Sequence, residues 1–563
     1  MIVMKIYKPA ILDSLKGYNK DQLIKDVVAG IIVAIIAFPL SVALAISSGM
    51  RPEQGLYTAI VGGVSVALFG GSRVQIGGAT AATVMTVFSI IGEYGFEGLA
   101  VATILAGLIL IIMGLCRVGA LLPYIPYSIT LAFTAAIGVG IFTGQLKEFF
   151  GMKIASLPVK NLSRIVTYAE HIGTVNWQAL LVGVIALVIL IVWPKINAVI
   201  PNSLVAILVT TPMVLLLKMD VNTIQSVYGQ LPSNFPKLTV PGFGLELVEA
   251  VLPSAVTLAI LVAIVSLLSC VVTDGLTGIR HDSNSELIGQ GVANIVCGLF
   301  GAVPIAGAVA RSSVSVKNGG KTPIVGVVHS AVVLVILLVM MPLAGFIPMP
   351  TLAAILILVA YNMSNVPAIT SLLFKAPKTD AIIFLATFCT GIFVDLMTAI
   401  EVGVIITACL FMKRMAEVTS VSGWRYVEDA DSIGELTDTK MKGDLAKVPA
   451  HTLVYEINGP MFFAASDELL NIRAKDDTMV LIIRMRSVPA LDITALNTLR
   501  KIYKECEEKG IFLIFSHVLD QPYKTMKKNG FVEAIGDEHF VAKIQDALSL
   551  ADEKIKEKST WQF

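Results

Sequence analysis

The chain has 563 residues, of which 55% are hydrophobic and only 15% are charged. Soluble proteins of this length carry more charge, so the composition excludes a soluble protein throughout and indicates a membrane protein. The formal net charge of +1 indicates no particular partner.

The first 26 residues are basic and contain no apolar core followed by a small-residue cleavage site, so they are not a signal peptide. Residues 1–26 are therefore predicted to be a cytoplasmic segment that leads into the first span. A partly disordered basic tail is the alternative that the sequence leaves open.

Apolar segments follow over residues 27–415, and we interpret this region as a transmembrane transport domain with fourteen spans. The predicted spans lie near 27–47, 54–70, 79–91, 98–115, 124–144, 177–193, 200–217, 250–273, 285–301, 308–317, 323–341, 350–364, 379–393 and 397–415. Segments 79–91 and 308–317 are shorter than the roughly 20 residues that a lipid-facing helix needs, so they are not ordinary spans.

An even number of spans puts both termini on one side of the membrane. Basic residues gather at the N-terminus and in the loops of that same side, which predicts a multi-pass protein of the cell (inner) membrane with cytoplasmic N- and C-termini.

The two short segments stand third in each set of seven spans, at Gly77–Thr83 and Gly307–Ser313. This placement predicts a seven-plus-seven inverted repeat, in which two half-helix N-termini face one anion with their free N–H groups. An isolated guanidinium is costly in a bilayer, so Arg311 is expected to face a hydrated, protein-lined cavity. Close helix packing by small residues is the alternative reading of these segments.

Several motifs resemble the SulP sulfate-permease family over nearly the whole chain. They are Pro52–Ala59, in which Gln54 stands where the family has Tyr, Gly70–Arg73, Ser266–Ser269, Asp274–Gly278, Ser283–Leu287, Gly289–Gly291 and Asn318–Pro323. Three further stretches look closest to bacterial members that carry C4-dicarboxylates: Ala310–Ser313, Tyr361–Ser364 and Ala376–Asp380.

The resemblance implies an all-α membrane domain in which a core domain of spans 1–4 and 8–11 moves against a gate domain of spans 5–7 and 12–14. It places an anion between the N-termini of half-helices 3 and 10, bound mainly by backbone amides. The implied neighbours of the anion are Phe38, Leu40, Leu44, Gly78, Ala79, Thr80, Ala310, Arg311 and Ser312. Arg311 would add a fixed charge and a planar fork, or, in the alternative reading, anchor the gate domain or a lipid headgroup.

One position departs from the family pattern. Many members have an acidic residue just before Ser266 that is thought to bind a coupling proton or sodium ion, and here that residue is Val265. Asp274 is the nearest carboxylate in the same span and is a candidate for the coupling ion, although a structural residue in an Asp-Gly turn at the helix end is the favoured reading.

The tail resembles a STAS domain. We predict a linker and the start of this domain over 416–450, the domain itself over 451–553 and a C-terminal tail over 554–563. Apolar runs at 452–457, 480–484 and 511–515 predict strands, and 466–474 and 492–508 predict helices, which together give a small α/β sheet. Asp492 is expected to cap a helix, and Ile493 replaces the Ser that is phosphorylated in related antagonists, so the domain is expected to serve dimer contacts or regulation.

These features predict a secondary transporter of a dicarboxylate, sulfate or bicarbonate, with the lipid bilayer and a second copy of the chain as partners and no nucleic acid. A nucleobase transporter of the same fold or a chloride channel-like exchanger are the alternatives, and a membrane enzyme or sensor ranks below them. No enzyme chemistry, cofactor or metal is expected, because the sequence contains no nucleophile–base set, phosphate loop or metal-ligand cluster.

Overall fold

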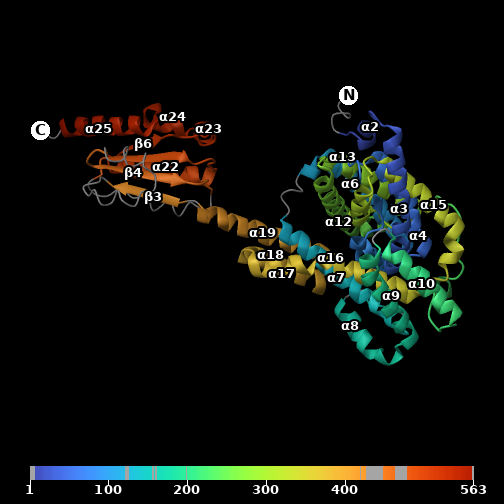
Figure 1. Cartoon of the computed structure of the whole chain (residues 1–563). Coiled ribbons are helices and arrows are strands. Elements are labelled where there is room, and N and C mark those ends of the chain that lie inside the picture. Colours follow the sequence, from blue (N-terminus) through green and yellow to red (C-terminus); the bar gives the residue numbers. More distant parts are fainter. Residues whose placement is uncertain are drawn as a thin grey trace. The chain divides into compact units, whose positions relative to one another are not determined.

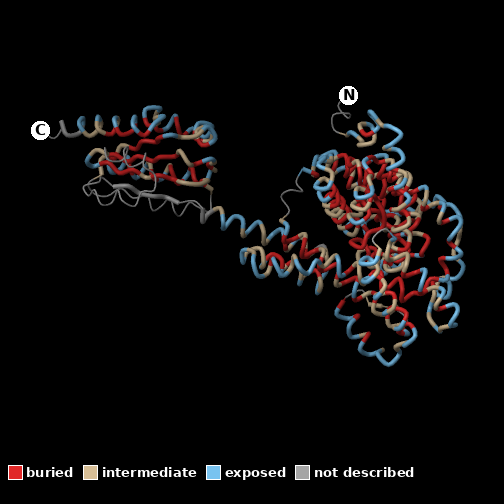
Figure 2. Tube along the Cα trace, viewed as in Figure 1, coloured by how far each residue is buried: buried red, intermediate tan, exposed pale blue. Residues whose placement is uncertain are grey.

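The computed structural model describes residues 7–120, 126–154, 157–158, 161–197, 200–418, 420–425, 448–462 and 478–560. The chain divides into two compact units, Met1–Val404 and Ile405–Phe563 (Figure 1). Each unit has buried residues of its own in its interior (Figure 2). The domain boundaries expected from the sequence remain predictions.

The first unit is helical, and every segment predicted to span the membrane overlaps a helix. The last of these helices begins in the first unit and continues into the second. These elements are α3 (Lys20–Ser47), α4 (Pro52–Tyr57), η1 (Thr58–Gly62), α5 (Gly63–Phe69), η2 (Ala81–Thr83), α6 (Val84–Leu115), α7 (Tyr127–Phe150), α9 (Trp177–Ile196), α10 (Asn202–Leu216), α12 (Leu245–Thr277), α13 (Ser283–Leu299), α14 (Val309–Lys317), α15 (Ile324–Ala344), α16 (Met349–Ser364), α18 (Lys378–Phe393) and α19 (Leu396–Val418). Shorter elements not expected from the sequence are α2 (Ala10–Ser14), α8 (Asn161–Glu170), η4 (Ile172–Thr174), α11 (Ile224–Tyr228) and α17 (Val366–Lys375).

Seven stretches of the described chain are long and apolar enough to cross a membrane, by length and composition. They are Lys20–Ser47, Ala81–Leu115, Tyr127–Phe150, Trp177–Ile196, Leu245–Thr277, Ile324–Ala344 and Met349–Lys375. The other predicted spans lie in shorter helices, except 397–415, which lies in the 23-residue helix α19.

One glycine interrupts the helix that joins two of the predicted spans. Helix α6 contains residues 84–91 of the short segment 79–91 and all of segment 98–115, and its backbone leaves helical geometry at Gly95, where φ is 70°. Glycine adopts this left-handed conformation without the Cβ clash that other residues meet, so the chain turns there between the short segment and the next.

The helices of the first unit pack as two groups. Helices α3 to α6 and α12 to α15 contact mainly one another, and α7, α9, α10, α16 and α18 contact mainly one another. This division matches the expected core and gate domains, so the first set of helices is called the core group and the second set the gate group. The two groups meet where α16 crosses α3.

The outer helices carry large apolar side chains that no protein covers (Figure 2). Helix α9 exposes Leu181, Val188 and Ile191, and α15 exposes Val335 and Val339. Water-facing helices carry polar residues on such faces, so these surfaces face lipid and the unit is a multi-pass membrane domain.

The second unit contains a five-stranded sheet in the order β3-β4-β5-β6-β7, with β3 antiparallel and the other strands parallel. Its strands are β3 (Ser420–Arg425), β4 (Thr452–Asn458), β5 (Val480–Ser487), β6 (Phe512–Ser516) and β7 (Phe540–Val541), and its helices are α22 (Ile493–Glu508), α23 (Asp520–Lys528), α24 (Phe531–Ile535), η7 (Asp537–His539) and α25 (Ile544–Thr560). Leu481 and Ile483 face α22 to α24, whereas Val480 and Ile482 face α25, so helices cover both sides of the sheet.

The three predicted strands and the helix at 492–508 are confirmed, and Asp492 caps that helix by accepting a hydrogen bond of 2.8 Å from the Ala495 backbone N–H. The helix predicted at 466–474 lies outside the described residues. Strands β3 and β7 and helices α23 to α25 were not expected.

Removing residues 419–563 should leave the first unit folded, because its hydrophobic clusters draw on described residues only up to Ile400. The truncated protein should elute as one sharp peak in detergent and unfold cooperatively near the temperature of the intact chain. A cut after Trp424 is the matched comparison, because it keeps five residues of β3 without their partner strand, and an unpaired strand promotes aggregation. Aggregation of the shorter form alone would show that the units do not fold separately.

Candidate functional site

Two short strands join the halves of the membrane domain. Strand β1 (Gly77–Gly78) pairs antiparallel with β2 (Ala306–Gly307), so that Gly77 lies opposite Gly307 and Gly78 opposite Ala306. The Ala308 N–H extends this ladder by donating 2.9 Å to the Ile76 carbonyl. The ladder satisfies the backbone of two extended segments that lie among apolar helices.

Each strand leads directly into a helix. After β1 the chain forms η2 and then α6, and after β2 it forms α14 from Val309. No side chain caps the start of η2 at Thr80 or the start of α14 at Ala308. The first-turn N–H groups of a helix have no partner within the helix, so both half-helices present donors and positive dipole ends at the ladder, as the sequence analysis expects.

An amide side chain that the sequence analysis missed holds the ladder in place. Gln75 donates from Nε2 to the Ser266 carbonyl at 3.2 Å and accepts on Oε1 from the hydroxyls of Ser269 at 2.8 Å and Ser312 at 3.4 Å. The Ser266 hydroxyl in turn accepts from the Gly307 N–H at 2.9 Å. The only signal in the sequence is one amide within the apolar run Val74–Ile76.

Ser312, one of the predicted site residues, belongs to this network. Its hydroxyl accepts a hydrogen bond of 2.9 Å from the Ile76 N–H. It therefore fixes the first turn of α14 against the segment that enters β1, and its side chain points into the core group.

Arg311 lies behind the two half-helix starts rather than in an open space. Its side chain is 1% exposed, and Nη2 donates to the Ser41 hydroxyl at 3.2 Å and to the Ala79 carbonyl at 3.3 Å. Nε and Nη1 have no partner among the described residues. The hydrated cavity expected around Arg311 is not observed, because α3, β1 and α14 enclose the guanidinium.

The other residues predicted to surround the anion differ in burial and in what they pack against. Gly78, Ala79 and Thr80 are buried at the ladder, whereas Ala310 is exposed, so the outer face of the first turn of α14 is open. Leu44 and Ala79 belong to the large hydrophobic cluster, and Phe38 and Leu40 pack against it.

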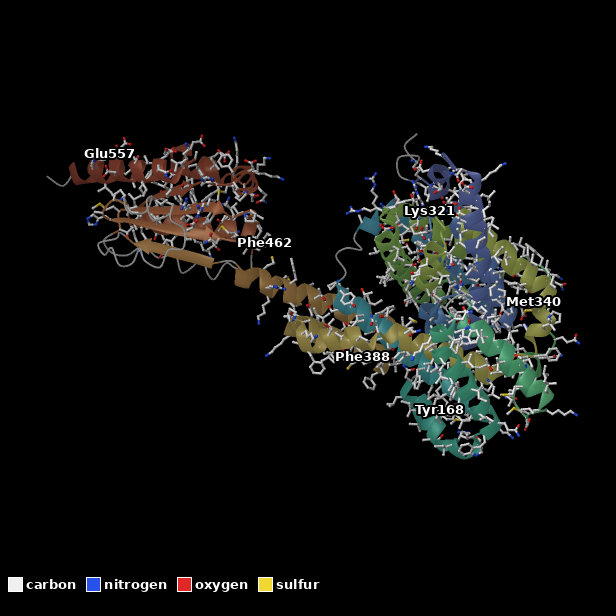
Figure 3. The ribbon with its side chains drawn as sticks, viewed as in Figure 1. Tyr168, Lys321, Met340, Phe388, Phe462 and Glu557 are labelled. Atoms are coloured by element: carbon white, nitrogen blue, oxygen red, sulfur yellow. The ribbon has the colours of Figure 1, made fainter. Side chains whose placement is uncertain are left out.

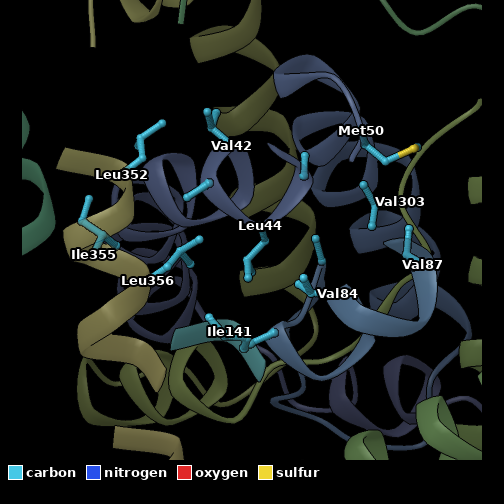
Figure 4. Close-up of a cluster of buried hydrophobic side chains, with 14 of the residues drawn as sticks. Val42, Leu44, Met50, Val84, Val87, Ile141, Val303, Leu352, Ile355 and Leu356 are labelled. Atoms are coloured by element: carbon cyan, nitrogen blue, oxygen red, sulfur yellow. The ribbon is translucent and has the colours of Figure 1, made fainter. Parts of the chain in front are cut away.

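That cluster contains residues from both helix groups. In Figure 4, Leu44 of α3 lies among Val84 of α6, Ile141 of α7 and Leu356 of α16. The seam between core and gate around Leu44 is thus made of aliphatic side chains. One turn further along α3, Gln145 of α7 donates a hydrogen bond of 2.8 Å across the seam to the Ser47 hydroxyl.

Asp274 is not brought to the ladder. It accepts on Oδ2 from the His281 backbone N–H at 3.2 Å and lies 2.7 Å from His281 Nδ1. Both residues line a cavity of about 330 Å³ that Lys321 also borders, near the start of α3 (Figure 3). Asp274 lies in the last turn of α12, as the helix-end interpretation expects, but the Asp-Gly pair is helical rather than a separate turn, because α12 continues to Thr277.

Val265 lies much closer to the ladder than Asp274. It precedes Ser266, which binds Gly307, and it is partly buried against two hydrophobic clusters. The position at which relatives are expected to hold a coupling ion is therefore apolar here.

Two further cavities open between the core and gate groups. One of about 350 Å³ is lined by Val84, the first residue of α6, and another of about 280 Å³ shares Met85 and Gly140 with it. Both therefore extend along the α6–α7 seam from the start of the first half-helix. Sequence reasoning missed them, since cavities depend on how helices from distant parts of the chain meet.

Comparisons with known proteins agree with this architecture. Residues 23–387 match the model of the sulfate permease family, and residues 445–547 match that of the STAS domain. The putative sulfate transporter YvdB of Bacillus subtilis is 35% identical over 93% of this chain and 97% of its own length. The bicarbonate transporter BicA of Picosynechococcus is 30% identical over 87% of this chain and 88% of its own. A solved structure of SLC26A9 shares the fold, with a TM-score of 0.86 at 19% identity over 99% of this chain and 94% of that one.

Gly78→Ala should destabilise the membrane domain, because a Cβ at this position would overlap Nη1 of Arg311 and displace the guanidinium from Ser41 and Ala79. Overpacking of this kind costs about 1–3 kcal/mol, which should appear as a lower thermal midpoint in detergent. Gly92→Ala is the matched control in α6, where no atom lies within 4 Å of the added Cβ. There alanine should leave the midpoint unchanged or raise it, and an equal loss in both variants would contradict the packing argument.

Proposed function

The chain belongs to the sulfate permease family, and from that premise we propose that it is a secondary transporter that moves a small oxyanion across the membrane by alternating access. The proposed substrate is a dicarboxylate, sulfate or bicarbonate, held between the starts of η2 and α14. The observation that carries the proposal is the pair of uncapped half-helix N-termini, joined back to back at the β1–β2 ladder.

Oxyanion binding at such a place needs donors and positive potential, and the ladder region supplies both. Each half-helix offers first-turn N–H groups together with its dipole, a combination that binds carboxylate, sulfate or phosphate in many proteins. The exposed Ala310 leaves the N–H side of α14 approachable, and a small side chain there lets an anion come close to the backbone.

Arg311 would act on the anion as a fixed charge from behind the backbone. Its observed partners, Ser41 and Ala79, are neutral, so its positive charge is not cancelled by a hydrogen-bonded carboxylate. In a poorly solvated interior a charge acts over a longer distance than it does in water. This role replaces the planar fork expected from the sequence.

Alternating access would follow from sliding of the gate group along the core group. The aliphatic seam around Leu44 makes no directional bonds between these side chains, so its register can change at a low energetic cost. The cavities along α6 and α7 would then be one of the two access routes to the anion. We further propose an inner-membrane protein with cytoplasmic termini that works as a homodimer, with the STAS domain in dimer contacts or regulation.

The substrate is best identified with purified full-length protein in liposomes. Uptake of sulfate, bicarbonate, chloride and succinate should be measured separately, with empty liposomes as the control. Transport of at least one oxyanion supports the proposal, and chloride alone would favour the exchanger reading. Transport of none of the four would contradict the proposal.

Arg311→Ala should weaken binding of the transported anion more than tenfold while the protein remains folded. A charge-assisted interaction is worth roughly 1.5–3 kcal/mol, and a tenfold change needs only about 1.4 kcal/mol. Binding is measured by calorimetry on purified protein. Arg117→Ala, which removes an exposed guanidinium after α6, should bind like the wild type, and unchanged affinity in Arg311→Ala would rule out a role for this charge.

Transport by the wild type should depend little on imposed sodium or proton gradients, because Val265 offers no oxygen ligand or exchangeable proton. Val265→Glu should introduce a pH dependence of transport, since a carboxyl group beside Ser266 can take up and release a proton. Val265→Gln is the matched control, polar but without a titrating group. Strong sodium or proton coupling in the wild type, with the membrane potential clamped, would show that another residue performs this task.

A further inference from the structure

His329 of α15 is a buried polar residue that the proposed mechanism has not used. Its side chain is 0% exposed, and neither Nδ1 nor Nε2 has a partner among the described residues. Buried polar atoms nearly always have partners, and leaving one without a hydrogen bond destabilises the fold. A residue kept at such a cost in an apolar helix calls for a role other than stability.

The packing of three helices places His329 level with Arg311. Val325 of α15 and Val314 of α14 lie in one small cluster with Val33 of α3. His329 is one turn beyond Val325, and Arg311 is one turn before Val314.

The step from Val325 to His329 and the step from Val314 back to Arg311 both run toward the C-terminal end of α3. Helices α3 and α15 run side by side in parallel, because Asp26 accepts from the Thr322 hydroxyl at 2.6 Å and Gly30 faces Val328. Helix α14 runs the opposite way, because Val314 packs near Val33 whereas Arg311 reaches the later residue Ser41. His329 and Arg311 therefore lie at a similar level on helices that both pack against α3.

The chemistry of the two side chains is complementary. A guanidinium has only donors, and Nε and Nη1 of Arg311 lack acceptors. A neutral imidazole has one acceptor nitrogen, and a second positive charge beside Arg311 would be unfavourable in this interior.

The buried carboxylates of the core group are already engaged elsewhere. Asp26 accepts from Tyr18, Gln22, Lys321 and Thr322. Glu286 accepts from the backbone N–H groups of Gly71 and Ser72 and from the Gln290 amide. The third buried carboxylate, Glu53 of α4, pairs with Arg51. None of the three accepts a hydrogen bond from the Arg311 guanidinium, so we take the imidazole as its complementary acceptor.

We propose that His329 is a positioning residue for the anion site, whose neutral imidazole accepts a hydrogen bond from Arg311 through one buried water. This inference rests on the proposed function. A carboxylate in the place of His329 would orient the guanidinium equally well but would cancel its charge. The imidazole orients Arg311 and leaves the positive charge available to the anion.

The first test compares stability with affinity in full-length protein. His329→Leu removes both ring nitrogens at similar volume, so its thermal midpoint should change little, because the hydrogen bond that is lost is offset by the removal of buried polar atoms. The panel again consists of sulfate, bicarbonate, chloride and succinate. For the anion of this panel that the wild type transports, KM should nevertheless rise about fivefold. His329→Gln, which keeps an acceptor, should restore a KM close to that of the wild type.

Ser330→Ala is the matched control at the next residue of α15. The Ser330 hydroxyl is buried and donates 2.8 Å to the Ala59 carbonyl. Its loss should lower the thermal midpoint and leave KM unchanged, which is the opposite pattern. A lower midpoint with unchanged KM in His329→Leu would show a structural residue and overturn the proposal.

A double-mutant cycle tests whether His329 acts through Arg311. If it does, His329→Leu should change KM less than about twofold in an Arg311→Gln background, because the partner that it orients is gone. Independent, additive effects would overturn the positioning role while leaving anion transport intact. Absence of uptake of all four anions by the wild type would instead contradict the proposed function itself.

Discussion

The architecture of the membrane domain depends on the antiparallel pairing of two strands of two residues, Gly77–Gly78 with Ala306–Gly307. Extended backbone among apolar helices is tolerated only where its polar groups find partners. The pairing supplies those partners and brings two short helices to one place from residues more than two hundred positions apart. Because it is antiparallel, the chain leaves the ladder in opposite directions, and each exit begins a half-helix.

Two side chains that bind neutral groups make this arrangement rigid while leaving its charge uncompensated. Gln75 ties β1 to α12 and α14 through the hydroxyls of Ser269 and Ser312. Arg311 closes the space behind the ladder by binding Ser41 and Ala79. Apart from Nε and Nη1 of Arg311, the polar side-chain groups of this network are held by backbone and hydroxyls, and the seam around Leu44 is aliphatic. Such a site gives a rigid core group against which a gate group can move.

The sequence alone predicted much of the fold and part of the site. Long apolar runs predicted the helices, because in a bilayer only a helix satisfies all of its backbone hydrogen bonds within a single segment of chain. Two Gly-rich stretches too short to span predicted the half-helices, and motif resemblance predicted the family and the STAS domain. In the C-terminal unit, β4, β5, β6 and α22 followed from apolar periodicity, whereas β7 is too short, at two residues, to give a pattern.

What the sequence by itself determined is therefore the local structure and the kind of site, because these follow from runs and spacings of neighbouring residues. The tertiary structure alone decided the burial of Arg311 beneath Gly78, the network of Gln75, the separation of Asp274 from the ladder and the approach of His329 to Arg311. Each of these depends on which faces of distant helices meet. A single amide in 74–76 or a single imidazole in α15 carries no periodic signal, and its partners lie on helices that only packing brings together.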